Sequence, residues 1–118
     1  MKDVVILSGV RTAIGEYGGS LKSNAPTDLA AKVVHEALLR AQIDPNEVDH
    51  LVFGNVIHGE ARDMYLARVA CINGGLPQHT AALTVNRLCG SGLQAIISAS
   101  QSILLNDTLA AVAGGAES

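Results

Sequence analysis

Short apolar runs alternate with longer amphipathic stretches along all 118 residues of the chain. The runs are continuous and rich in aliphatic residues, and they cover positions 4–7, 51–57, 81–85 and 109–113. Helices are predicted over positions 30–41, 64–73 and 93–105. The evidence is either apolar residues at helical spacing or cap and stop residues at the two ends of the segment. Alternation of this kind is typical of parallel sheets joined by right-handed crossovers. We therefore predict an α/β fold in the order βαβαβαβ, with a mainly parallel sheet between helices.

A cysteine lies at one of the predicted strand-to-helix junctions. Cys89 follows the apolar run 81–85 and is followed by Gly90, Ser91 and Gly92. The glycines allow a sharp turn and a close approach of a reactant to the backbone. Unpaired N–H groups in the first helical turn favour negative charge, and the thiolate is the nucleophilic form of cysteine. These residues favour a cysteine nucleophile beside an amide pocket for a developing oxyanion.

Two other interpretations of this segment stay open on the local pattern. Cys89 is equally consistent with a small buried apolar residue whose neighbouring glycines allow close packing. Residues 90–95 also fit the G-x-G-x-x-G/A pattern of dinucleotide sites, with Glu117 as the acidic residue after the next strand. That pattern normally lies in the first βα unit of a fold, whereas two such units precede it here.

Charge and composition argue against nucleic-acid-binding, disulfide-rich, metal-binding, secreted and membrane-spanning proteins. The net charge of −3 and the scattered basic residues argue against nucleic acid as the main partner. Two cysteines give neither a disulfide framework nor metal-ligand spacing, and Cys71 is expected in the core of the predicted helix 64–73. No secretory leader and no apolar run long enough to span a membrane is visible. We therefore expect a cytoplasmic protein in a reducing compartment.

The predicted topology places the histidines relative to Cys89. In open parallel sheets, sites form at the carboxyl ends of the strands. His58 follows the second apolar run and Cys89 follows the third, so both are expected at the same sheet edge. His79 precedes the third run and is expected at the opposite edge. His58 is therefore the one histidine placed to approach Cys89, although loop histidines more often bond to nearby backbone.

Four segments of the chain resemble the thiolase family of β-ketothiolases and acetyl-CoA acetyltransferases. Asn86–Ile96, with the sequence NRLCGSGLQAI, resembles the family's nucleophile segment. Ser8–Gly15, Phe53–Val56 and Ala113–Ser118 resemble its first strand and loop, its second strand and its glycine-rich turn. The resemblance covers the whole chain. Its details are most similar to bacterial β-ketothiolases of short-chain fatty acid and polyhydroxyalkanoate metabolism.

The resemblance implies a reaction and a substrate class. In a thiolase, the residue matching Cys89 attacks an acyl-CoA thioester, and its backbone N–H contributes to an oxyanion hole. Gly90, Ser91 and Gly92 would form the supporting turn. Coenzyme A thioesters are then substrates, and neither a metal nor a bound cofactor is expected. The resemblance also implies a homodimer or homotetramer formed through the strand Ala82–Asn86.

The resemblance further implies that residues 1–118 are a partial N-terminal thiolase domain. The family's second cysteine in a C-x-G motif, its G-H-P histidine and its N-E asparagine have no counterpart in this sequence. The isolated chain is therefore expected to be inactive, while the intact protein would be a thiolase. The alternative is a non-catalytic interaction module that keeps the thiolase fold.

Overall fold

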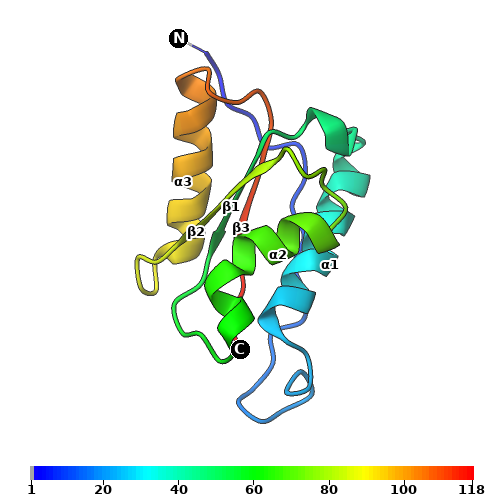
Figure 1. Ribbon diagram of the computed structural model, residues 1–118, viewed down its shortest axis with the longest axis vertical. Helices are drawn as coiled ribbons and strands as arrows, with labels where there is room; N and C mark the ends of the chain where they lie inside the picture. Colours follow the sequence, from blue (N-terminus) through cyan, green and yellow to red (C-terminus); the bar gives the residue numbers. More distant parts are fainter. Residues whose placement is uncertain (1) are drawn as a thin grey trace.

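A computed structural model describes residues 2–118 as a parallel sheet covered by helices on both faces (Figure 1). The strands are β1 (His50–Gly54), β2 (Ala81–Val85) and β3 (Ala111–Gly115), in the spatial order β2-β1-β3. The α-helices are α1 (Pro26–Ala41), α2 (Leu66–Asn73) and α3 (Ser91–Leu104). Two short 3-10 helices, η1 (Pro45–Glu47) and η2 (Ala61–Tyr65), lie in the connections. The predicted α/β class with a parallel sheet between helices is confirmed.

The central strand β1 is buried on both of its faces. Leu51 and Phe53 pack in the core formed with α1 and α2, and Val52 packs with Ala95 and Ala99 of α3. Successive side chains of a strand point to opposite faces, so a strand covered on both sides reads as a continuous apolar run. The sequence contains such a run over 51–57, which predicts a strand there, but the observed strand ends at Gly54.

All strands in the sheet are parallel, so their carboxyl ends reach the same edge. Gly54, the last residue of β1, is in register with Val85 of β2 and with Gly115 of β3. The observed β2 has the predicted bounds of 81–85, whereas β3 begins two residues later than the predicted run 109–113. This common edge is the place where the sequence predicts Cys89 and His58 to lie.

The predicted first strand over Val4–Leu7 is wrong. Residues 2–15 have no regular secondary structure, and the side chains of Val5, Ile6 and Leu7 are 70%, 82% and 64% exposed. β2 and β3 occupy both edges of β1, and within residues 2–118 this segment pairs with the outer edge of neither β2 nor β3. The segment and β3 together line an apolar cavity of about 950 Å³. Within residues 2–118 the sheet therefore has three strands, where the sequence predicts four.

Candidate functional site

Cys89 is exposed at the carboxyl edge of the sheet. It lies in the short loop between β2 and α3, which is yellow in Figure 1. Among the described residues Cys89 is therefore not a buried packing residue. An exposed thiol in front of a helix N-terminus has the environment that reactive cysteines share.

Side-chain hydrogen bonds hold the backbone that precedes Cys89. The hydroxyl of Ser91 accepts a hydrogen bond from the N–H of Arg87 at 2.8 Å and donates one to the carbonyl of Leu88 at 2.6 Å. The side-chain oxygen of Asn86 accepts from the N–H of Leu88 at 3.0 Å. Leu88 has a φ of 50°, in the left-handed region that a leucine rarely adopts. Side-chain hydrogen bonds thus stabilise a strained residue immediately before the cysteine.

The same loop leaves backbone donors available next to the thiol. The N–H groups of Gly90 and Ser91 bond to the carbonyls of Arg87 and Leu88 at 3.1 Å each. Within residues 2–118, the N–H groups of Cys89 and Gly92 donate no hydrogen bond to another backbone group. Free amides at a helix N-terminus attract negative charge. The turn can therefore hold an anionic oxygen close to the Cys89 side chain.

The ends of β1 and β3 support this turn from below. A Cβ atom added at Gly54 would lie 2.7 Å from the Cβ of Ser91 and 3.0 Å from the nitrogen of Gly92. One added at Gly115 would lie 3.6 Å from the Cα of Gly92. Gly54 is not among the predicted site residues, although a glycine at the end of a buried strand is a signal of a close backbone approach.

The structure places the two histidines as predicted. His58 lies in the loop that follows β1, at the same edge as Cys89, and its Nδ1 lies 2.6 Å from the side-chain oxygen of Asn55. His79 is exposed in the turn that precedes β2, at the opposite edge. Asn55 also donates from its backbone N–H to the carbonyl of Val85 at 3.1 Å. The His58 loop is thereby attached to the strand that leads to Cys89.

The carboxylate of Glu117 is engaged by backbone. It accepts hydrogen bonds from the N–H of Val56 at 3.1 Å and from the N–H of Ile57 at 2.7 Å. In a dinucleotide site the corresponding acidic residue would face the ribose hydroxyls. The observed contacts join the turn after β3 to the loop after β1 instead, which counts against the dinucleotide interpretation.

Cys71 is buried in α2 and packs in the main core, as predicted. Its Sγ lies 4.0 Å from the carbonyl oxygen of Thr80. Burial raises the pKa of the Cys71 thiol above its ordinary value, and the nearby Arg68 guanidinium offsets part of that increase. A thiol in this environment is inert, so Cys71 has a packing role.

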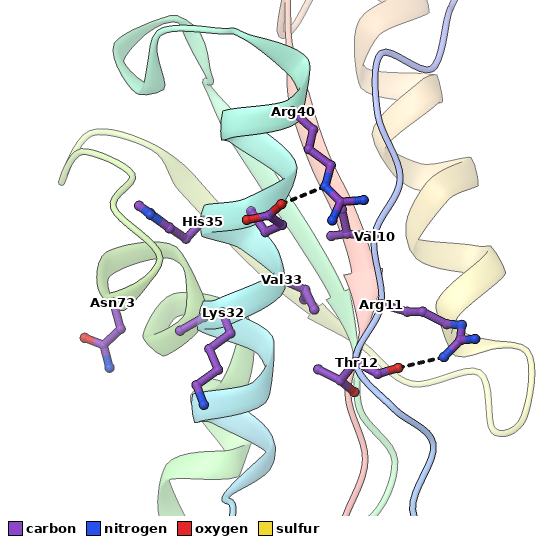
Figure 2. A pocket seen from close by; sticks show the side chains of 10 residues that line it. Val10, Arg11, Thr12, Lys32, Val33, His35, Arg40 and Asn73 are labelled. Atoms are coloured by element: carbon purple, nitrogen blue, oxygen red, sulfur yellow. Dashed lines mark hydrogen bonds and ion pairs between the residues drawn. The ribbon is translucent and has the colours of Figure 1, made fainter.

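A second hollow of about 550 Å³ lies on the outer side of α1, but its polar groups do not converge (Figure 2). Arg40 is paired with Glu36 at 2.7 Å, and Arg11 donates to the carbonyl of Thr12 at 2.9 Å. Lys32 and His35 point in different directions in this view. The hollow therefore offers no focused anion site.

Residues 2–118 contain neither a metal-binding cluster nor a membrane-spanning helix. No group of three or more His, Cys, Asp or Glu side chains in that range is arranged to hold a metal ion. None of the helices in that range has the length and apolar character needed to cross a bilayer.

The fold and the loop together define a class: parallel α/β proteins that present an exposed cysteine at a strand-to-helix turn. The model of the thiolase N-terminal domain matches residues 4–118. The chain therefore belongs to the thiolase family, as the sequence segments indicated.

Individual relatives agree with this assignment. The chain is 65% identical over 117 residues to the β-ketothiolase BktB of Cupriavidus necator, covering 99% of this chain. It is 43% identical over 117 residues to the acetyl-CoA acetyltransferase of Escherichia coli K12, again covering 99% of this chain. In each case the chain spans only a part of the relative, 30% and 29% of its length.

Solved structures show the same relationship. The crystal structure of the Bacillus anthracis acetyl-CoA acetyltransferase matches with a TM-score of 0.89 and 40% identity, over 94% of this chain and 28% of that one. Human mitochondrial 3-ketoacyl-CoA thiolase in complex with CoA matches with a TM-score of 0.77 and 40% identity, over 80% of this chain and 24% of that one. The described residues thus have a thiolase-like fold.

Proposed function

We propose that residues 1–118 are part of the N-terminal domain of a β-ketothiolase, an acyl-CoA:acetyl-CoA C-acyltransferase. The observation that carries the proposal is the exposed Cys89 beside free backbone amides at the N-terminus of α3. Relatives named β-ketothiolase and acetyl-CoA acetyltransferase, which match nearly the whole of this chain, support it.

The proposed reaction begins with attack of the Cys89 thiolate on the carbonyl carbon of an acyl-CoA. A new carbon–sulfur bond forms, the bond to the CoA sulfur breaks, and CoA leaves as a thiolate that takes up a proton. A second acyl-CoA then loses its α-proton to a base outside this chain. The resulting carbanion attacks the acyl group, and Cys89 leaves as a thiolate. The products are a β-ketoacyl-CoA and the free enzyme, and the reverse direction is thiolysis.

The turn around Cys89 supplies positioning and charge stabilisation in this mechanism. The N–H of Cys89 would donate to the oxyanion that forms when the thioester carbonyl is attacked. Gly90 and Gly92 carry no side chains that obstruct the substrate. Ser91 holds the turn through its hydrogen bonds to the preceding residues and has no nucleophilic role.

We assign the substrates and the assembly from the same resemblance to thiolases. Coenzyme A thioesters are the substrates, and no metal or bound cofactor takes part. The outer edge of β2 has no partner strand within residues 2–118, and Leu83 in it is 44% exposed. Strand Ala82–Asn86 would pair there with a second copy in a homodimer or homotetramer. A cytoplasmic role in short-chain fatty acid or polyhydroxyalkanoate metabolism fits the two free thiols and the resemblance described above.

We further propose that the 118 residues alone do not complete the reaction. The chain spans about 30% of the length of its curated relatives. The family's base, activating histidine and second oxyanion hole have no matching motifs in this sequence. A purified chain of these residues should therefore show no thiolysis above background.

The test uses the full-length protein that contains this chain. Thiolysis of a β-ketoacyl-CoA by CoA is measured for the wild type, Cys89→Ala and Cys71→Ala. The proposal predicts an active wild type, an inactive Cys89→Ala and an active Cys71→Ala. An inactive wild type would support the non-catalytic module, and an active Cys89→Ala would contradict the assignment of the nucleophile.

A further inference from the structure

Hydrogen bonds join the loop that carries His58 to the turn after β3. The carboxylate of Glu117 binds the N–H groups of Val56 and Ile57, at 3.1 and 2.7 Å. The side-chain amide of Asn55 donates to the carbonyl of Ala116 at 2.9 Å. These contacts connect the loop after β1 to the turn after β3. The His58 imidazole is therefore presented at a defined position, although the residue itself is exposed.

The hydrogen bonds of Asn55 fix the tautomer of His58. Asn55 is only 1% exposed, and the carbonyl oxygen of Ala116 can only accept, so the Asn55 atom facing it must be the amide nitrogen. The amide oxygen of Asn55 then faces Nδ1 of His58 at 2.6 Å, and an oxygen without a proton can only accept. The proton of a neutral His58 therefore resides on Nδ1. Its Nε2 carries a free lone pair and is a hydrogen-bond acceptor.

This acceptor lies at the edge where the proposed reaction occurs. β1 leads directly from Gly54, which touches Ser91, to Asn55 and His58. The N–H of Asn55 is bonded to Val85 at the end of β2, the strand that precedes the Cys89 loop. Cys89 lies at this same edge, so a thioester bound at Cys89 is at the edge that carries His58.

We propose that His58 is a substrate-binding residue whose Nε2 accepts a hydrogen bond from an amide N–H of the coenzyme A arm. The inference rests on the proposed function and adds a contact to the same site. The pantetheine arm of CoA carries amide N–H groups, and a neutral imidazole nitrogen is a suitable acceptor for them. Asn55 is then a positioning residue, because it would act on the substrate through the imidazole and not by direct contact.

The test compares the KM and kcat of the full-length wild type with those of His58→Ala, His58→Gln and His79→Ala. His58→Ala should raise the KM for the CoA thioester about three- to tenfold, the value of one lost hydrogen bond, with kcat almost unchanged. The amide of glutamine places an acceptor near the position of Nε2, so His58→Gln should restore most of the affinity. His79→Ala, at the opposite edge, should match the wild type.

A thioester of a thiol without amide groups provides a second measurement. With that substrate, His58→Ala and the wild type should have the same KM. The inference would be overturned by an unchanged KM of His58→Ala for the CoA thioester, or by a failure of His58→Gln to recover affinity. In either case an active wild type would leave the proposed function intact. An inactive wild type would overturn both.

Discussion

Gly54 and Ser91 are in such close contact that a Cβ atom at Gly54 would lie 2.7 Å from the Cβ of Ser91. The end of β1 thus passes directly beneath the first turn of α3. Ser91 in turn bonds to the two residues that precede Cys89. The contact between the central strand and Ser91 therefore fixes the position of the cysteine loop relative to the sheet.

This contact predicts that Gly54→Ala impairs the site. The added methyl group would meet the side chain and backbone of Ser91, which cannot move without displacing α3. We expect a loss of about 1–3 kcal/mol in the free energy of unfolding, as for overpacked cores, together with a lower kcat. Chemical denaturation and steady-state kinetics of the full-length protein measure these quantities.

Gly9→Ala is the matched control for that substitution. No atom lies within 4 Å of a Cβ added at Gly9, and its φ is not in the left-handed region, so stability and activity should be close to those of the wild type. Equal behaviour of Gly54→Ala and Gly9→Ala would show that the contact beneath Ser91 is unimportant.

A second prediction concerns the hydroxyl of Ser91. Ser91→Ala removes the acceptor for the Arg87 N–H and the donor to the Leu88 carbonyl. We expect a loss of about 1–2 kcal/mol in stability and a fall in kcat, because the cysteine loop loses its side-chain support. Ser100→Ala, which removes a hydroxyl bonded only within α3, is the control and should retain kcat. A wild-type kcat for Ser91→Ala would argue against this role.

The buried thiol of Cys71 predicts a pH dependence of stability. Its pKa is raised in the folded state, chiefly by burial, so the folded protein keeps this proton at a pH where the unfolded chain has lost it. Stability should therefore be unaffected by Cys71 below the ordinary thiol pKa of about 8.5 and should decrease as the pH rises above it. The loss continues until the pH exceeds the raised folded-state value.

Denaturation of the full-length wild type and of Cys71→Ala across this alkaline range measures the effect. The difference in stability between the two should become smaller as the pH rises, because only the wild type contains the titrating thiol. A difference that is constant with pH would contradict the assignment of the alkaline loss to Cys71.

A fourth prediction concerns assembly through the outer edge of β2. In Leu83→Lys a charge replaces a half-exposed apolar side chain in the strand proposed to pair with a second copy. The full-length variant should dissociate at protein concentrations where the wild type is oligomeric. Light scattering coupled to size-exclusion chromatography measures this. Leu39→Lys, at an exposed position on α1, should leave the mass of the assembly unchanged.

Local patterns were sufficient to predict much of the fold. The run 81–85 has the bounds of β2, and the predicted helix over 93–105 differs from α3 by a residue or two at each end. Both segments are defined by residues close together in the sequence, since period and flanking glycines indicate them. The order of strands and helices then placed His58 and His79 at opposite edges.

The remaining features depend on contacts between distant parts of the chain. Val4–Leu7 has the composition of a buried strand, but it forms no strand in the structure. Whether such a segment joins a sheet depends on its position relative to the other strands, which the local sequence does not specify. The bonds from Glu117 to the loop after β1 span about sixty positions in the sequence. The left-handed Leu88 carries no sequence signal, because neighbouring side chains hold it in that conformation.

The most direct test of the central claim is to identify the residue that becomes acylated. The full-length protein is incubated with an acyl-CoA in the absence of a second substrate, quenched in acid, digested and examined by peptide mass spectrometry. The account predicts one acyl group on the peptide that contains Cys89, removed on addition of CoA, and none on the peptide that contains Cys71. Acylation at another residue, or full turnover with Cys89 unmodified at every time point, would contradict it.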